Sequence, residues 1–150
     1  MPRFTIEILE GRTMEQKRVL TKEICDAISE CLHVPLDAAL LRIIEVPFES
    51  FAQGGALRSD ASSKKGKPIY GSILEPRITG QFVAGHPMEE KRALVKRITQ
   101  RIAPILDVLE EDVKIFMIEM QADQFASGGM MLCDDPNNSK YTFVDTTKIK

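Results

Sequence analysis

Polar and apolar residues alternate near the start of the chain and then recur at helical spacing. Residues 4–8 read Phe-Thr-Ile-Glu-Ile, which is the period of a half-buried strand, and Gly11 ends this pattern. Thr13 and Gln16 then predict a capping box at the start of a helix, and a second strand is expected over residues 40–46. The helix carries one apolar stripe, made by Leu20, Ile24, Ile28 and Leu32.

This β-α-β pattern occurs twice. Residues 2–55 match residues 76–129 without a gap, at an offset of 74, with 20 identities in 54 aligned positions. Chance would give roughly three. The two strands of each copy should be parallel, because a helix joins them. We therefore expect an α/β fold in which two tandem β-α-β units form a four-stranded mixed sheet with both helices on one face.

The repeat divides the chain into four parts. A first unit covers residues 2–55, and a polar linker covers residues 56–75, with room for a short hairpin over residues 69–74. A second unit covers residues 76–129, and residues 130–150 are expected to form a C-terminal hairpin and tail, turning at Asp-Asp-Pro-Asn-Asn. Two helices cover only one face of such a sheet, so we also expect association with further copies.

Composition limits the classes of partner. The 150 residues are 43% hydrophobic and 28% charged, which fits a folded domain with a core. A net charge of -2, with no basic stripe, makes a nucleic-acid partner improbable. No apolar run is long enough to cross a bilayer, and the first residues do not resemble a signal peptide, so a soluble cytoplasmic protein without a membrane partner is expected.

The cysteines and histidines predict neither disulfides nor a metal site. Cys25 and Cys31 are six residues apart and point to different faces of the expected helix, and Cys133 is distant in the sequence. The chain has only two histidines and no C-x-x-C motif. We therefore expect free thiols and no bound metal.

Pro2 is the residue with the most distinctive chemistry. Removal of Met1 would leave a free secondary amine at the start of a strand, and burial in an apolar pocket would lower the pKa of that amine so that it acts as a general base. A proline that merely begins an edge strand is the alternative. Pro76, its counterpart in the second copy, is internal, and its imide nitrogen cannot act as a base.

These features resemble the tautomerase superfamily, specifically 4-oxalocrotonate tautomerase and its fused two-unit relatives. The resemblance depends on the following residues: Pro2, residues 8–12, residues 13–17, Pro35, Phe51 and Gly54-Gly55. It implies β-α-β units that assemble as hexamers of single units or, here, as a homotrimer of fused pairs. It also implies an N-terminal proline acting as general base or acid, no cofactor, and small carboxylate substrates, often enols or unsaturated acids.

The resemblance assigns three residues directly. Pro2 matches the catalytic proline, Arg12 matches the first substrate-binding arginine, and Phe51 matches the aromatic residue that keeps the proline dry. An arginine beside a helix N-terminus is disfavoured by the helix dipole. A shared anion therefore explains Arg12 better than helix stability does. A surface arginine pointing into water and a plain core phenylalanine are the alternatives.

The chain departs from the family at the second arginine. Leu40 stands there in the first copy and Lys114 in the second, while Arg42 lies two residues beyond Leu40 on the same face of the strand. In the second copy His86 replaces Arg12, and Phe125 is the counterpart of Phe51. Arg42, Lys114 and His86 thus join Arg12 as candidates to bind a carboxylate, with Phe51 and Phe125 as apolar walls.

Two fused relatives suggest other reactions. In cis-3-chloroacrylic acid dehalogenase and malonate semialdehyde decarboxylase, the proline of the first copy works with arginines of the second. Here the matching segment, residues 83–86, has none, and no water-activating carboxylate is evident near Phe125. If the crossed geometry holds, Pro2 would face His86, Phe125 and either Lys114 or an arginine of another subunit.

Three functions follow for testing. The first is a cofactor-independent tautomerase acting on a small enol or unsaturated 2-hydroxy or 2-keto acid through Pro2. The second is hydration, dehalogenation or decarboxylation of a three-carbon unsaturated or semialdehyde acid. The third is a non-catalytic paralogue that serves assembly.

Overall fold

A computed structural model describes residues 2–63 and 75–137 of the chain. The large elements follow in the order β1 (Arg3–Leu9), α1 (Met14–Cys31), β2 (Leu40–Val46), β5 (Arg77–Val83), α3 (Met88–Leu106) and β6 (Lys114–Met120). The short elements are β3 (Ala52–Gln53), β4 (Ala56–Leu57), α2 (Arg58–Ser63), β7 (Ala126–Ser127) and β8 (Met130–Met131). Single 3-10 turns occur at Leu36–Ala38, Phe48–Ser50, Glu110–Asp112 and Leu132–Asp134.

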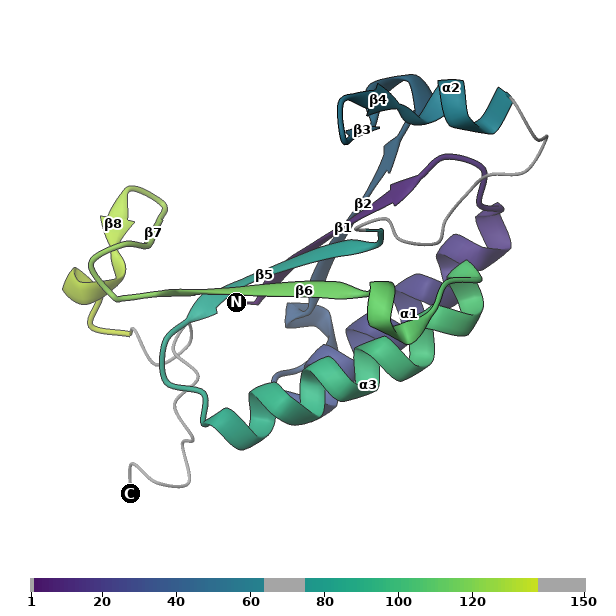
Figure 1. The fold of residues 1–150 in the computed structure, drawn as a ribbon. Coiled ribbons are helices and arrows are strands. Elements are labelled where there is room, and N and C mark those ends of the chain that lie inside the picture. Colours follow the sequence, from purple (N-terminus) through teal and green to yellow (C-terminus); the bar gives the residue numbers. More distant parts are fainter. Residues whose placement is uncertain (1, 64–74, 138–150) are drawn as a thin grey trace.

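The predicted four-stranded mixed sheet is confirmed. Its strand order is β2-β1-β5-β6, with β1 parallel to β2, β5 parallel to β6, and β1 antiparallel to β5 (Figure 1). At the centre of the β1–β5 pairing Thr5 lies opposite Thr79, whereas Arg3 lies opposite Gln81 and Glu7 lies opposite Arg77 at its ends. The first strands of the two units, β1 and β5, therefore lie side by side and run in opposite directions. At each end of the sheet, the start of the first strand of one unit lies beside the end of the first strand of the other unit.

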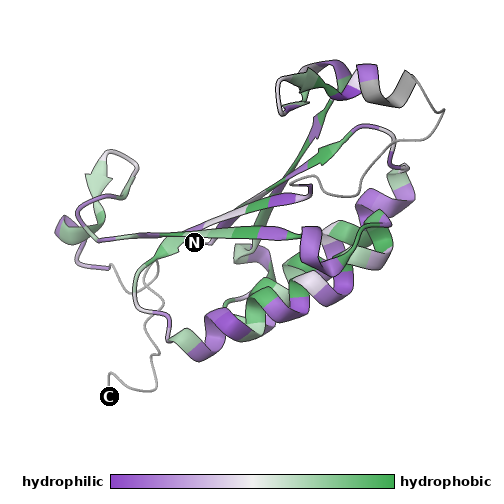
Figure 2. Cartoon of the chain, viewed as in Figure 1, coloured by the Kyte–Doolittle hydropathy of each residue, from purple (hydrophilic) through white to green (hydrophobic). Residues whose placement is uncertain are grey.

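Helices α1 and α3 pack together against one face of this sheet, as predicted (Figure 1). Their apolar sides face inward and their polar sides outward (Figure 2). The predicted capping box is present, because the Thr13 side chain accepts from the Gln16 N–H and the Gln16 side chain accepts from the Thr13 N–H. Both predicted helix stripes are fully buried, as are the core residues Phe4, Ile6, Ile8, Ile78 and Phe82.

The repeat is visible in details of the structure. Lys17 of α1 forms an ion pair with Glu45 of β2, and Lys91 of α3 forms the matching pair with Glu119 of β6. Each pair ties a helix to the outer strand of its own unit. The two units therefore have the same topology and the same ion pair between helix and strand.

Two short hairpins span the expected unit boundaries. The β3–β4 hairpin pairs Ala52 with Leu57, and the β7–β8 hairpin pairs Ala126 with Met131, so each hairpin crosses an expected boundary. Gly-Gly pairs form both turns with positive φ angles, which is why the chain can reverse there. The first part of the expected linker is thus a strand followed by α2.

Two expected features lie outside the described residues. The short hairpin over residues 69–74 is one, and the tail segment after residue 137 is the other. Of the tail, residues 130–131 pair with residues 126–127. Neither of the long helices in the described ranges is apolar enough over a sufficient length to pass through a membrane.

The sheet face opposite α1 and α3, here called the open face, carries apolar side chains. Leu40, Ile44, Phe116 and Ile118 lie on it and are 37 to 48% exposed. Arg42 also lies on this face, because it pairs with Thr5 on β1. Apolar side chains on a broad sheet face favour association with another surface.

Candidate active site

The antiparallel pairing of β1 and β5 separates the candidate residues into two groups. Pro2 lies at the end of the sheet where β5 finishes, which also carries His86 and the segment after β6 (Figure 1). Pro76 lies at the other end, because its carbonyl accepts from the Lys114 N–H and Arg77 lies opposite Glu7. We call these the Pro2 end and the Pro76 end.

Pro2 itself is buried and held by the backbone. Its carbonyl oxygen accepts from the Leu40 N–H at 3.3 Å, which extends the β1–β2 ladder by one residue. Leu40 is the residue that stands in place of the family's second arginine, and it offers an apolar side chain at this end. The proline is therefore buried and fixed at the start of β1.

His86 lies at the Pro2 end with its side chain 2% exposed. Its Nδ1 atom is 2.9 Å from Oε2 of Glu90, and its ring meets the Phe82 ring edge-on at 5.2 Å. Burial lowers the pKa of His86 below its ordinary value of 6.5, while the hydrogen bond to Glu90 opposes that shift. Burial thus favours the neutral imidazole at pH 7.

Phe125 belongs to the same end of the sheet. It follows β6, is partly buried, and accepts a hydrogen bond from the Leu132 N–H through its carbonyl. Leu132 is itself buried, which anchors the segment after the β7–β8 hairpin. The structure thus brings Phe125 and His86 to the end at which Pro2 begins, as the crossed geometry predicts.

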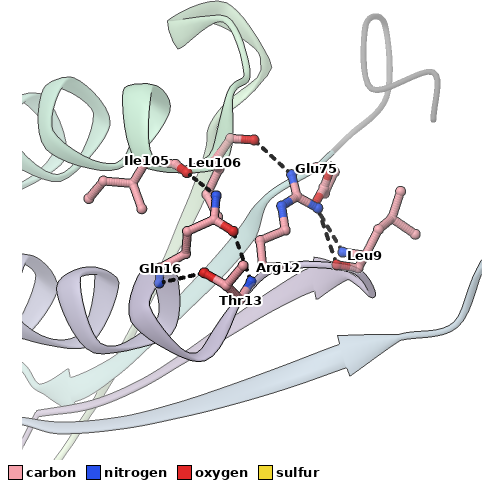
Figure 3. Close-up of polar contacts among 7 residues, drawn as sticks. All are labelled: Leu9, Arg12, Thr13, Gln16, Glu75, Ile105 and Leu106. Atoms are coloured by element: carbon pink, nitrogen blue, oxygen red, sulfur yellow. Dashed lines mark hydrogen bonds and ion pairs between the residues drawn. The ribbon is translucent and has the colours of Figure 1, made fainter. Parts of the chain in front are cut away.

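Arg12, in contrast, lies at the Pro76 end and binds an anion from its own chain (Figure 3). Its Nη1 atom is 2.6 Å from Oε1 of Glu75, and Nη2 is 3.4 Å from Oε2. Nη1 also donates to the Leu9 carbonyl at 3.1 Å and Nη2 to the Leu106 carbonyl at 2.9 Å. The anion beside Arg12 in this structure is thus the Glu75 carboxylate, whereas a substrate carboxylate was expected there.

A pocket of about 410 Å³ lies at this same end. Its lining residues are Glu7, Ile8, Leu9, Val46, Phe51, Ala52, Glu75, Arg77, Lys114 and Phe116. The Arg77 guanidinium stands over the Phe116 ring at 4.9 Å, and Lys114 Nζ donates to the Glu111 carbonyl at 2.6 Å. Phe51 and Lys114 therefore share a pocket with each other and not with Pro2 of the same chain.

Arg42 stands apart from both groups, exposed in the middle of β2 on the open face. Of the six candidate binding residues, all of which the structure describes, His86 and Phe125 lie at the Pro2 end of the same chain. Any contribution of Arg12, Lys114 or Phe51 to the surroundings of Pro2 would have to come from a second copy.

Sequence reasoning missed Glu75, Glu7, Arg77 and Phe116. Glu75 stands directly before Pro76, where the aligned first unit has Met1, so the repeat gave no reason to expect a carboxylate there. The sequence pointed to this site only through Arg12, because an arginine at that position favours a nearby anion. It did not indicate which residue would provide the anion. Among the described residues, no three His, Cys, Asp or Glu side chains gather as a metal site would require.

Comparison with known proteins places both units in one family. The family described as "Tautomerase enzyme" matches residues 2–61 and again residues 76–135. The 2-hydroxymuconate tautomerase of Stutzerimonas stutzeri is 46% identical over 55 residues, which are 37% of this chain and 87% of that protein. A probable tautomerase of Bacillus cereus is 38% identical over 60 residues, which are 40% of this chain and 98% of that protein.

Solved structures match the two-unit chain as a whole. A fused 4-OT described as an asymmetric trimer has a TM-score of 0.71 at 20% identity, over 86% of this chain and 94% of that chain. A malonate semialdehyde decarboxylase inhibited by 3-bromopropiolate has a TM-score of 0.58 at 21% identity, over 84% of this chain and 88% of that chain. The shared fold and the two family matches lead to one conclusion: this chain belongs to the tautomerase family, with two tautomerase units in a single polypeptide.

Proposed function

We propose that the chain is a tautomerase that uses Pro2 as its general base after removal of Met1. The observation that carries this proposal is the difference between the two prolines. Pro2 is buried at the start of β1, where loss of one preceding residue frees its nitrogen, whereas the Pro76 nitrogen forms a peptide bond with Glu75. Each chain would therefore hold one site with a secondary amine.

The surroundings of Pro2 suit a base that works near neutral pH. Leu40 and Phe125 give this end of the sheet an apolar character, and burial of an amine disfavours its charged form. The nitrogen takes a proton from the hydroxyl of an enol and returns a proton to carbon, so the product is the keto isomer and the amine is regenerated. This transfer needs no group beyond the amine.

The substrate class follows from the relatives. Proteins named 2-hydroxymuconate tautomerase match 37 to 39% of the chain at 44 to 46% identity, which favours a small unsaturated 2-hydroxy acid. Burial disfavours the charged form of His86, so we expect an arginine or lysine to neutralise the substrate carboxylate. Arg42 from the same chain and Lys114 from a second copy are the candidates, because Arg12 is buried against Glu75.

A homotrimer would bring such residues together. The apolar residues of the open face need a partner surface, and fused relatives of the same fold are described as trimers. We propose that the open faces of three chains pack against one another and that neighbouring chains complete the site around Pro2.

Hydration, dehalogenation or decarboxylation is the second candidate. The fold similarity to malonate semialdehyde decarboxylase favours it. Residues 83–86 contribute no arginine at the Pro2 end, and burial favours the neutral form of His86 there, which disfavours it. A non-catalytic assembly role is what remains if neither activity is found.

Removal of Met1 and replacement of Pro2 test the proposal together. Intact mass of the purified protein shows whether Met1 is absent, and ketonisation of 2-hydroxymuconate and phenylenolpyruvate measures activity. We expect the Pro2→Ala variant to fold and to lose at least about 100-fold in kcat/KM, the usual contribution of general-base catalysis. Pro104→Ala, an exposed proline of α3, is the matched control and should keep full activity. Unchanged turnover in Pro2→Ala would refute the mechanism.

A further inference from the structure

The contacts of Glu75 are those of a bound carboxylate. Its Oε1 atom accepts from both the Leu9 N–H, at 2.9 Å, and Arg12 Nη1, at 2.6 Å, while Oε2 faces Nη2 (Figure 3). The side chains of Arg12 and Glu75 are 4% and 3% exposed. A two-pronged guanidinium together with a backbone N–H is an arrangement that recognises carboxylates in general.

The receptor lies in the first unit, whereas its ligand comes from the linker. Leu9 ends β1 and Arg12 follows it, and Glu75 directly precedes Pro76, the first residue of the second unit. The matching position at the other end is His86, which bonds instead to Glu90 of α3. Among the described residues, the pairing of a buried arginine with a linker carboxylate occurs at the Pro76 end.

We propose that Glu75 is an internal ligand that fills a carboxylate-binding site at the Pro76 end and closes that site to small organic acids. The site consists of Arg12, the Leu9 N–H and the adjoining pocket of about 410 Å³. Glu75 is itself part of the pocket wall, beside the apolar side chains of Ile8, Val46 and Phe51. An acid that displaced its carboxylate would therefore find an apolar space of ligand size next to the cation.

The charge of the pocket supports an anionic occupant. The charges of Arg12 and Glu75 cancel. The other charged lining residues are Arg77 and Lys114, which are positive, and Glu7, which is negative, so the lining has an excess of positive charge. Removal of the Glu75 carboxylate would add the uncompensated charge of Arg12, and a buried unpaired cation strongly favours capture of an anion. The ligand class expected after that removal is a small acid with an apolar body, for which benzoate is a suitable probe.

The test uses the full chain with Glu75→Ala. The Tm of wild type and variant is measured in sodium benzoate and in sodium chloride of equal ionic strength. A ligand that binds only the folded state raises the Tm by several degrees at about ten times its Kd. We expect that rise in Glu75→Ala and not in wild type, together with recovery of the wild-type chemical shift of the Leu9 amide proton on addition of benzoate.

Two further variants keep the test decisive. Glu75→Gln keeps the shape of the side chain and one acceptor oxygen but not its charge, and it should fold and bind benzoate more weakly than Glu75→Ala. Arg12→Met with Glu75→Ala removes the receptor and should lose the response. The proposal is overturned if benzoate stabilises wild type as much as Glu75→Ala, or if the response survives loss of Arg12.

This inference does not depend on catalysis by Pro2. Its readouts are stability and the Leu9 amide, and binding of benzoate near Pro2 would appear equally in wild type. Failure of one proposal therefore leaves the other standing.

Discussion

The Nη1 atom of Arg12 lies 2.6 Å from the Oε1 atom of Glu75, and this buried ion pair joins the first repeat unit to the residue directly before the second. Arg12 also reaches the carbonyl of Leu106 at the end of α3. One side chain of the first unit thus binds both the residue before the second unit and the end of the second unit's helix. Tandem units that pack in this way should unfold together.

Loss of either partner in this pair should be costly. We expect Arg12→Met and Glu75→Ala each to lower the free energy of unfolding by roughly 3 to 5 kcal/mol, because each leaves a buried charge without its partner. The double variant should lose much less than the sum. Chemical denaturation of the four proteins measures this coupling. Glu15→Ala, which removes an exposed ion pair with Arg18, is the control and should change little. Additive losses would contradict the account.

His86 should make the stability depend on pH. Its pKa is lowered in the folded protein, first by burial, so the unfolded chain takes up the proton at higher pH. Stability from this source is complete above pH 6.5, the ordinary value, and falls as the pH is lowered below it. Glu90, Lys91 and His33 also act on this ring, Glu90 against the shift.

The test compares unfolding of wild type and His86→Gln between pH 7.5 and 5, a range of ~2.5 pH units about the ordinary histidine pKa. Wild type should lose more stability over this range than His86→Gln does. Val19→Gln, a change on the exposed side of α1, serves as the control and should retain the wild-type slope. If the free energy of unfolding falls with pH equally in wild type and His86→Gln, then His86 has the same pKa in the folded and unfolded chain, contrary to the prediction.

Gly80 should tolerate no side chain while Phe4 remains. A Cβ atom at this position would lie 2.5 Å from Cε2 of the Phe4 ring, inside the core. We expect Gly80→Ala to cost roughly 1 to 3 kcal/mol through overpacking. Phe4→Leu should recover part of that loss when the two changes are combined, as measured by thermal unfolding. If Phe4→Leu recovers none of the stability lost in Gly80→Ala, the loss does not come from a clash with the Phe4 ring.

The open face should control assembly. Ile118, which is 46% exposed on β6, lies on the face that we propose to be covered in a trimer. Ile118→Glu should therefore shift the sedimentation coefficient toward that of a single chain and leave helix content unchanged. Val19→Glu, on the exposed side of α1, should leave the assembly intact. If both variants sediment as the same oligomer, the open face is not the interface between chains.

The fold was predictable from the sequence because every local signal agreed. The alternating strand, the Thr13–Gln16 capping box and the apolar stripe of each helix pointed to the same β-α-β unit, and the repeat doubled each signal. The boundary after residue 55 was less accessible. The β3–β4 hairpin is only two residues long on each side, too short to show a period.

The candidate site was predicted less completely, because its residues come from both units. Which of them lie together depends on whether β1 and β5 pair in the same or in opposite directions. Antiparallel pairing of β1 with β5 places Pro2 with His86 and places Arg12 with Pro76, and no local pattern fixes that choice. The need of Arg12 for an anion could be argued from its place beside a helix N-terminus. That Glu75 would meet this need could not, since the contact spans 63 residues of the chain.

The central claim, that Pro2 is a general base, is tested most directly by titration of its nitrogen. Nitrogen NMR of the chain labelled with ¹⁵N-proline follows the ionisation of Pro2 in the folded protein and in urea. The account predicts one proline amine that titrates near neutral pH when the chain is folded and at a higher pH when it is unfolded. An amine whose pKa is as high in the folded protein as in urea, or a nitrogen that does not titrate because Met1 is retained, would contradict it.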